Sequence, residues 1–263
     1  MKIRRRKIRL IIWLSIIVYL AITMVYVGRK LGNATCSEIQ VNVNDSTGHK
    51  FVQPIDIKNI LNKYQVIGKS LDSINIFKLE TEIKRNSFIK KVSIYKTLSG
   101  KIIVDLEQRN PILRIINTKG QNYYLDEEGI LMPVHPGYAA RVLVANGKIE
   151  ASFVDGLNLL KYTDDVTSRK YFLVRDLFYL TKYINSLPFW KCQIEQVYVT
   201  EDLEFELVPL VGEHTILFGR FEDFEWKFKK LEAFYRQGLK QKGWSMYKQI
   251  NVKFSNQVVC TRR

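Results

Sequence analysis

The chain of 263 residues has little cysteine and histidine, and this scarcity excludes several classes of protein. Its three cysteines, Cys36, Cys192 and Cys260, are odd in number, which argues against a disulfide framework, and no two have metal-ligand spacing. Cys192 and Cys260 can pair only if their strands are neighbours, and the alternative is that they are small buried thiols. The sequence therefore predicts neither a disulfide scaffold nor a metal site.

Catalytic motifs are also absent from the sequence. It contains no G-x-S-x-G, H-E-x-x-H, Walker loop or G-x-G-x-x-G. The three histidines, His49, His135 and His214, have no nucleophile or metal-spaced partner nearby, so we expect them on surface loops. The acidic run 126–128 reads as a turn rather than as paired catalytic acids. We therefore expect no enzyme activity, no cofactor, no metal and no small-molecule substrate.

Acidic residues are missing from the first 37 positions, where eight basic residues lie. The whole chain carries +15, so that subtracting eight from fifteen leaves +7 for the other 226 residues. More than half of the excess charge thus belongs to the N-terminal segment. The total suggests nucleic acid or a membrane surface, but the position of the charge favours the membrane.

Residues 10–27 form a run of eighteen without charge, Gly or Pro. As a helix this run spans roughly 27 Å, close to the thickness of the hydrocarbon core of a bilayer. Six basic residues precede it, and Arg29 and Lys30 follow it. The positive-inside rule then predicts a cytoplasmic tail at 1–9, a transmembrane helix at 10–28 and a juxtamembrane linker at 29–37.

A cleaved signal peptide is the alternative interpretation of this segment. The apolar run is longer than a usual signal core, and no clear Ala-x-Ala site follows it. Residues 31–36 also make a poor lipoprotein box. We therefore expect an uncleaved anchor and an exported body.

Residues 38–110 show the periodicities of a β-α-α-β-β unit. The predicted elements are a strand at 38–44, a helix opening at Pro54, a helix capped by Asn75, and strands at 92–95 and 102–107. Each element has one apolar face, which favours two helices packed on one side of a three-stranded sheet. The runs 88–94 and 102–111 resemble the end of a POTRA domain, a resemblance that implies polypeptide binding or protein docking.

Residues 111–263 are richer in strands, so the predicted fold class is α+β. A hairpin is expected at 123–133, with Gly129 at a positive φ, and a short strand at 140–145. A helical stripe runs from Leu173 to Leu187 and is terminated by Pro188. Further elements are strands at 194–200, 203–208 and 215–218, an aromatic helix at 221–235, and strands at 250–254 and 258–260 separated by a turn.

This second block resembles the extracytoplasmic β domain of the cell-division family FtsQ/DivIB. The resemblance rests on the Tyr-Leu-Asp-x-x-Gly hairpin that ends at Gly129, the strand 215–219, the Lys-rich helix around 229–231 and the strand 250–254. Together with the basic N-terminus, one anchor and a POTRA unit, it covers nearly the whole chain. It implies a non-enzymatic divisome scaffold in the cell inner membrane, with its C-terminal domain periplasmic and the protein at the division septum.

The resemblance also implies partners and a docking site. FtsQ proteins dock FtsB, a small bitopic coiled-coil protein, through their last strand, act with FtsL, and connect indirectly to the septal cell-wall synthases FtsW and FtsI. A strand near a chain end often lies at a sheet edge, where another chain can add a strand. Carried over, the site comprises Lys253, Phe254, Ser255, Asn256, Val258 and Val259. Phe254 is the expected apolar anchor and Lys253 the expected salt-bridge donor; alternatively, Val258 and Val259 simply complete the core.

Three other functions compete with this interpretation. Nucleic-acid binding is disfavoured, because the body is expected to be exported and acids interleave the lysines of 221–232. A POTRA protein for polypeptide transport or outer-membrane protein assembly usually carries several POTRA repeats or a barrel, and this sequence shows neither pattern. A membrane-tethered envelope enzyme is disfavoured by the missing catalytic constellation.

Overall fold

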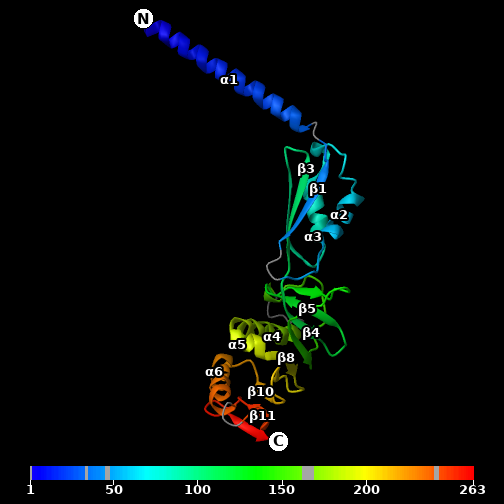
Figure 1. The fold of residues 1–263 in the computed structure, drawn as a ribbon, viewed down its shortest axis with the longest axis vertical. Helices are drawn as coiled ribbons and strands as arrows, with labels where there is room; N and C mark the ends of the chain where they lie inside the picture. The colour runs from blue at the N-terminus through cyan, green and yellow to red at the C-terminus, as the bar shows by residue number, and fades with distance from the viewer. Residues whose placement is uncertain (1, 33–34, 45–47, 162–168, 240–242) are drawn as a thin grey trace. The chain divides into compact units, whose positions relative to one another are not determined.

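The computed structural model describes the backbone of residues 2–32, 35–44, 48–161, 169–239 and 243–263. Side chains of 2–11, 29–32 and 169 lie outside the described part. The chain divides into two compact units, Met1–Gln108 and Arg109–Arg263 (Figure 1). The fold class is α+β, as predicted.

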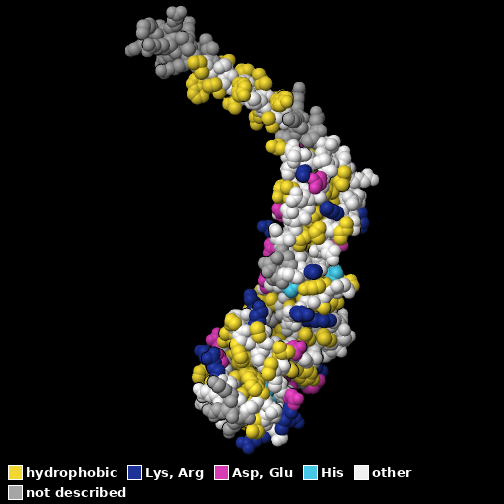
Figure 2. Space-filling model, viewed as in Figure 1, with side chains coloured by type: hydrophobic (Ala, Val, Ile, Leu, Met, Phe, Trp, Pro, Cys, Tyr) yellow, Lys and Arg dark blue, Asp and Glu magenta, His cyan; other side chains and the backbone are white. Residues whose placement is uncertain are grey.

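Unit 1 begins with a long helix, α1 (Lys2–Gly32), so the helix extends beyond the predicted span 10–28 at both ends. Its described side chains from Ile12 to Val27 are mostly apolar and exposed (Figure 2). Among the residues whose side chains are described, no helix is long and apolar enough to cross a membrane. Leu10 and Ile11, which open the predicted anchor, lie outside those residues, so the anchor stays a prediction.

The rest of unit 1 is a three-stranded sheet with helices. Its strand order is β1-β3-β2, with β1 parallel and β2 antiparallel to the central β3. Figure 1 shows α2 and α3 on the same side of this sheet. The elements are β1 (Glu38–Asn44), α2 (Pro54–Lys63), the 3-10 turn η1 (Leu71–Ser73), α3 (Ile76–Lys84), β2 (Ile89–Lys96) and β3 (Lys101–Gln108).

Local sequence signals account for this arrangement. Pro54 occupies the first turn of α2, where its missing N–H costs no hydrogen bond. The side chain of Asn75 accepts a hydrogen bond from the backbone N–H of Lys78 (3.0 Å), so the predicted cap of α3 is confirmed. Apolar residues of both helices are buried together with the apolar face of β3. They are Ile57, Leu61, Leu79, Ile83, Ile102, Val104 and Leu106.

Unit 2 is built on one nine-stranded sheet with the order β12-β11-β10-β9-β8-β7-β4-β5-β6. Figure 1 shows its helices α4, α5 and α6 on the same side of the sheet. The elements are β4 (Pro111–Ile116), β5 (Asn122–Asp126), β6 (Leu131–Pro133), β7 (Leu143–Gly147), η2 (Leu159–Lys161), α4 (Arg169–Ser186), α5 (Pro188–Gln193), β8 (Ile194–Val199), β9 (Phe205–Pro209), β10 (Thr215–Gly219), α6 (Phe224–Phe234), the π-helix η4 (Tyr235–Leu239), β11 (Tyr247–Asn251) and β12 (Val259–Arg262).

The element predictions at Pro188 and at 140–145 in unit 2 need correction. Pro188 follows the end of α4, as expected, but it also opens a second helix, α5, because proline fits the first turn of a helix. The strand expected at 140–145 begins at Leu143 instead and runs to Gly147. The predicted hairpin is confirmed, with Gly129 at φ 78°.

An aromatic cluster fixes α6 against the sheet near β10 and β11. The ring of Trp190 on α5 lies 5.5 Å from that of Phe228 and 5.0 Å from that of Tyr235, centroid to centroid. Phe228 in turn lies 5.1 Å from Phe218 on β10. This packing places α6 beside β11 and β12, the last two strands. The candidate site lies there.

Candidate partner-docking site

The last strand of unit 2 leaves one side open for pairing. Among the strands that the structure describes, β12 pairs only with β11, in antiparallel register from Asn251 opposite Val259 to Tyr247 opposite Arg262. Its outer backbone groups therefore have no neighbouring strand. Val259 is exposed, whereas Cys260 packs against the core. The chain thus has a C-terminal edge strand of the kind that the sequence predicted.

Most of the predicted site residues lie beside this strand rather than in it. The strand expected at 250–254 ends at Asn251, and 252–258 form a loop; of the six site residues, only Val259 belongs to β12. The reason is local: Asn251 Oδ1 accepts a hydrogen bond from Lys253 N (2.9 Å), and such side-chain bonds compete with the strand ladder. The apolar alternation at 250, 252 and 254 does not reveal this turn.

Lys253 already has an acidic partner within the chain. Its Nζ lies 2.8 Å from Glu204 Oε2, and its alkyl stem covers Gly219, where an added Cβ would come within 2.9 Å of it. An acidic residue of another protein must therefore compete with Glu204 for this ammonium group. The expected role of Lys253 as a salt-bridge donor to an acidic partner residue stays a prediction, and it would require Lys253 to exchange Glu204 for that residue.

Side chains of helix α6 hold the loop 252–258 by donating hydrogen bonds to the backbone carbonyl groups of the loop. Lys230 Nζ donates to the oxygens of Val252 (2.9 Å) and Phe254, and Trp226 Nε1 donates to that of Ser255 (2.8 Å). Burial lowers the pKa of the Lys230 ammonium. The side chain of Phe254 remains 48% exposed, so the backbone is fastened while the aromatic ring stays accessible.

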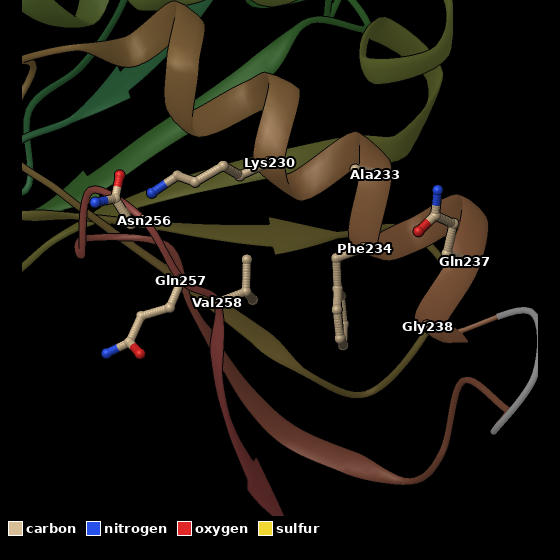
Figure 3. Close-up of a pocket in the computed structure, with 8 residues that line it drawn as sticks. All are labelled: Lys230, Ala233, Phe234, Gln237, Gly238, Asn256, Gln257 and Val258. Carbon is tan, nitrogen blue, oxygen red and sulfur yellow. The ribbon is translucent and has the colours of Figure 1, made fainter.

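A groove of about 530 Å³ opens between α6 and this loop. Phe234 and Val258 project into the space between helix and loop, and Lys230 extends toward Asn256 (Figure 3). Gly238 lets the Phe234 ring lie against the backbone at this end of the groove, because a Cβ there would meet the ring at 2.8 Å. The lining residues, which together we call the C-terminal groove, are Lys230, Ala233, Phe234, Gln237, Gly238, Asn256, Gln257 and Val258.

Sequence reasoning missed the helix side of this site. Trp226, Lys230 and Phe234 are spaced by four residues, which places them on one face of α6. The sequence predicted only an aromatic helix at 221–235, without a second face. The spacing of four, with a lysine between two aromatics, was the available signal for a second and partly exposed face.

Comparison with known proteins adds independent support for the family resemblance seen in the sequence. A family model described as "POTRA-like domain" matches residues 34–107. A second, described as "FtsQ/DivIB, C-terminal related", matches residues 110–261, more than half of the chain.

The chain belongs to the FtsQ/DivIB family. Membership indicates a scaffold role in cell division that works through protein–protein interactions, in a family that is generally not enzymatic. No curated protein matches the chain significantly. The family assignment made from the order of motifs is therefore confirmed by the two family models.

In this FtsQ/DivIB-family chain, His214 is not on the surface, contrary to the prediction. Its side chain is 2% exposed, and Nε2 lies 2.7 Å from the Tyr235 hydroxyl. Nδ1 is buried and has no hydrogen-bond partner among the described residues, and Gly212 packs against that edge of the ring. Burial, and then the nearby charge of Arg263, lower the pKa of His214. His49 and His135 are half-buried.

Residue Arg263, next to β12, also pairs with the segment that carries His214. Its guanidinium contacts the Glu213 carboxylate and donates to the Glu213 carbonyl oxygen (2.9 Å). The imidazole of His214 therefore lies close to the end of the edge strand. A second positive charge at this position would be costly, since it would be buried and close to Arg263.

The acidic run 126–128 is a structural turn, as predicted. Asp126 is 1% exposed, and its Oδ1 accepts hydrogen bonds from the N–H groups of Glu128 (2.9 Å) and Ile130 (2.8 Å). Its Oδ2 lies 2.8 Å from Arg109 Nη1. Burial raises the pKa of this carboxyl, and the backbone and Arg109 hydrogen bonds oppose that shift. This carboxylate shapes the hairpin and does not form an acid pair.

The three cysteines are free thiols. Cys36 is buried and Cys260 half-buried, but Cys192 on α5 is exposed, so the expectation of a small buried thiol is wrong for Cys192. Among the residues with described side chains, no group of three His, Cys, Asp or Glu is arranged to hold a metal ion.

Proposed function

We propose that this chain is a membrane-anchored divisome scaffold that docks FtsB and FtsL through the edge of β12 and the adjoining loop. The observation that carries the proposal is an edge strand with an open outer side, next to an accessible aromatic residue and a groove. Through these partners the protein would couple to the septal cell-wall synthases FtsW and FtsI. Its contribution is positional, bringing the partners together at the septum.

Docking at β12 would follow the physics of strand addition. An incoming strand hydrogen-bonds to the free backbone groups of an edge, and this pairing supplies affinity. Specificity then comes from side chains that alternate along the strand. Here Val259 offers an apolar contact on the edge, and Phe254 offers an exposed ring beside it. Asn256 and Val258 line the loop side of the C-terminal groove.

The proposed topology places residues 1–9 in the cytoplasm, 10–28 across the inner membrane, and the POTRA unit 38–110 and unit 2 in the periplasm. It is supported by the basic flank of the apolar run and by the exposed apolar side chains from Ile12 to Val27. On the face shown in Figure 2, Lys and Arg of unit 2 lie among Asp and Glu, as on an ordinary solvated surface. We expect the protein at the division septum.

One edge of the POTRA sheet, formed by β2, is less open than the edge formed by β12. Strand β2 lies at an edge of its sheet, but Glu80 Oε1 on α3 accepts the hydrogen bond of the Ile94 N–H (2.8 Å). A polypeptide that added to this edge would have to displace that carboxylate. Addition of a polypeptide at β2 is therefore the weaker proposal, and β1 forms the other edge of this sheet.

Replacement of Phe254 by Glu tests the docking site. Phe254 is 48% exposed and its carbonyl, rather than its ring, holds the loop, so the variant should fold. We expect co-purification of full-length protein with FtsB and FtsL to be lost, with an unchanged circular dichroism spectrum. Leu210→Glu is the matched control, because Leu210 is also exposed (61%) but lies outside the site.

Equal recovery of both partners with Phe254→Glu and Leu210→Glu would overturn docking at this loop. A fluorescent fusion to the N-terminus tests the division role separately. A ring at midcell is expected, and an even envelope signal would contradict it.

A further inference from the structure

Among the described residues of unit 1, five large hydrophobic side chains are exposed outside α1, including Ile55 and Tyr95, and the other three lie toward the end that α1 joins. Leu98 and Phe77 are each 77% exposed, and Ile67 is 56% exposed. Leu98 lies in the loop between β2 and β3, Ile67 in the loop after α2, and Phe77 in the first turn of α3. Single exposed apolar side chains are common on protein surfaces, whereas several that gather at one end of a unit mark an interaction site.

Two of these residues lie beside the chain that arrives from α1. Cys36 N donates to Lys69 O and Gly68 N donates to Cys36 O (2.8 Å each), which fixes the loop of Ile67 to the incoming segment. Ser37 N donates to Gly100 O (2.8 Å), which fixes the loop of Leu98 to the same incoming segment. The predicted linker residues 35–37 are therefore an integral part of the folded unit.

Phe77 belongs to the same end of the unit. Glu80 bonds to Ile94, which lies two residues before the end of β2, a distance of about 7 Å along the strand. Phe77 lies three residues closer to the start of α3, about 4.5 Å along the helix in the same direction. Phe77 is thus roughly level with the end of β2, where the loop of Leu98 begins.

The loop of Leu98 is held rigidly with this residue outward. Thr97 N donates to Lys101 O (2.8 Å), and Thr97 Oγ1 accepts from Lys101 N (2.9 Å). Gly100 takes a φ of 84°, and a Cβ there would meet Thr35 O at 2.9 Å. The loop is therefore pressed against the incoming chain while Leu98 remains in solvent.

The length of chain limits how far this end can be from α1. Gly32 ends the helix and Thr35 is already bonded into the unit, so three residue steps span at most about 11 Å. The polar layer on each side of a bilayer is roughly 5–8 Å thick. If α1 emerges from the membrane near Gly32, the loops of Ile67 and Leu98 lie within reach of that layer.

We infer that the end of unit 1 formed by Ile67, Phe77 and Leu98 rests on the lipid bilayer, with these side chains at the boundary between headgroups and acyl chains. This inference rests on the proposed anchor and adds a second contact to it. Apolar side chains favour this boundary because it removes them from water while neighbouring polar groups stay hydrated. The contact would limit the tilt of unit 1 relative to the membrane.

The test uses the full chain in vesicles of phosphatidylcholine and phosphatidylglycerol. An environment-sensitive NBD label is placed at Ser99→Cys, which leaves Leu98 in place, in a Cys192→Ser, Cys260→Ser background where the remaining Cys36 is 1% exposed. The control label is at Ile55→Cys, which is 55% exposed at the other end of the unit, near Gln108. Lipids that carry a shallow quencher then report contact, and alkaline carbonate extraction reports the anchor.

We expect a blue-shifted NBD emission at residue 99 that the lipid quencher largely abolishes, no quenching at residue 55, and loss of quenching at 99 when Leu98→Asp is added. Quenching at 99 no greater than at 55, in protein that resists carbonate extraction, would overturn the inference and leave the anchor intact. A blue shift without lipid quenching would overturn it in favour of a protein contact. Release by carbonate would overturn the anchor and the inference together.

Discussion

Replacing Lys230 with methionine would release the loop 252–258 from α6. The ammonium group donates to the carbonyl oxygens of Val252 and Phe254, and methionine keeps the apolar stem but removes both hydrogen bonds. A hydrogen bond from a charged group contributes about 1.5–3 kcal/mol. Because the loop is exposed and water can replace the lost donor, we take the lower value, about 1.5 kcal/mol, for the two bonds together.

Amide hydrogen exchange measures this change directly. The N–H of Val252 donates to Leu217 O (3.1 Å) and that of Lys253 to Asn251 Oδ1 (2.9 Å), so both amides report whether the loop is closed. A loss of about 1.5 kcal/mol in the free energy of local opening makes their exchange roughly tenfold faster. If FtsB docks at this loop as proposed, its binding should weaken as well, because an unfastened loop must be ordered on docking.

Lys229→Met is the matched control, since Lys229 is the exposed neighbour on the same helix and the substitution removes the same charge. Exchange at Val252 and Lys253 should remain at the wild-type rate in this variant. Equal exchange rates in the two variants would refute the view that Lys230 holds the loop, and would assign that role to Trp226 or to β11 alone.

Two further predictions concern buried charge in unit 2. The folded-state pKa of His214 is lowered from 6.5, so as the pH falls the imidazole is protonated in the unfolded chain before it is protonated in the folded chain. The free energy of unfolding should therefore fall as the pH drops below about 6.5, by at most about 1.4 kcal/mol per pH unit. Urea unfolding at pH 7.5 and 5.5 should show this loss in wild type and in the control His135→Gln but not in His214→Gln; an identical loss in all three would contradict the assignment. Arg109→Met should destabilise unit 2 by about 3 kcal/mol, because it leaves the buried Asp126 carboxylate without its cation. The control Arg236→Met removes an exposed pair with Glu232 and should cost less than about 0.5 kcal/mol by the same urea titration, and equal costs would show that the Asp126 site is not special.

The sequence was most informative where structure depends on near neighbours. Pro54, Asn75 and Gly129 act within a few residues of themselves, and each occupies the cap or turn that local rules predict. The alternation of apolar residues likewise indicated β1 and β3. These signals, in their order along the chain, were enough to identify the family.

Prediction failed where a residue's environment depends on distant segments. His214 stands in a stretch that reads as a loop, and only the packing of Tyr235 and Gly212 buries it. Pro188 ends one helix, but its second role at the start of α5 depends on Trp190 finding a place in the core. Neither environment is encoded within a window of a few residues.

The candidate docking site was likewise predicted from the sequence only in part, and the rest depends on the tertiary structure. By itself, the sequence determined that the chain carries a basic flank before an apolar run and most of its strands and helices in order, because charge, hydropathy and short-range periodicity are properties of neighbouring residues; the POTRA-like unit was inferred from a resemblance. Only the tertiary structure decided that Asn251 ends β11, that Glu204 takes Lys253, and that Lys230 holds the loop from 22 residues away. The physical reason is that a backbone carbonyl or an ammonium group is satisfied by whichever partner the fold brings near, and that partner is set by the packing of α6 on the sheet.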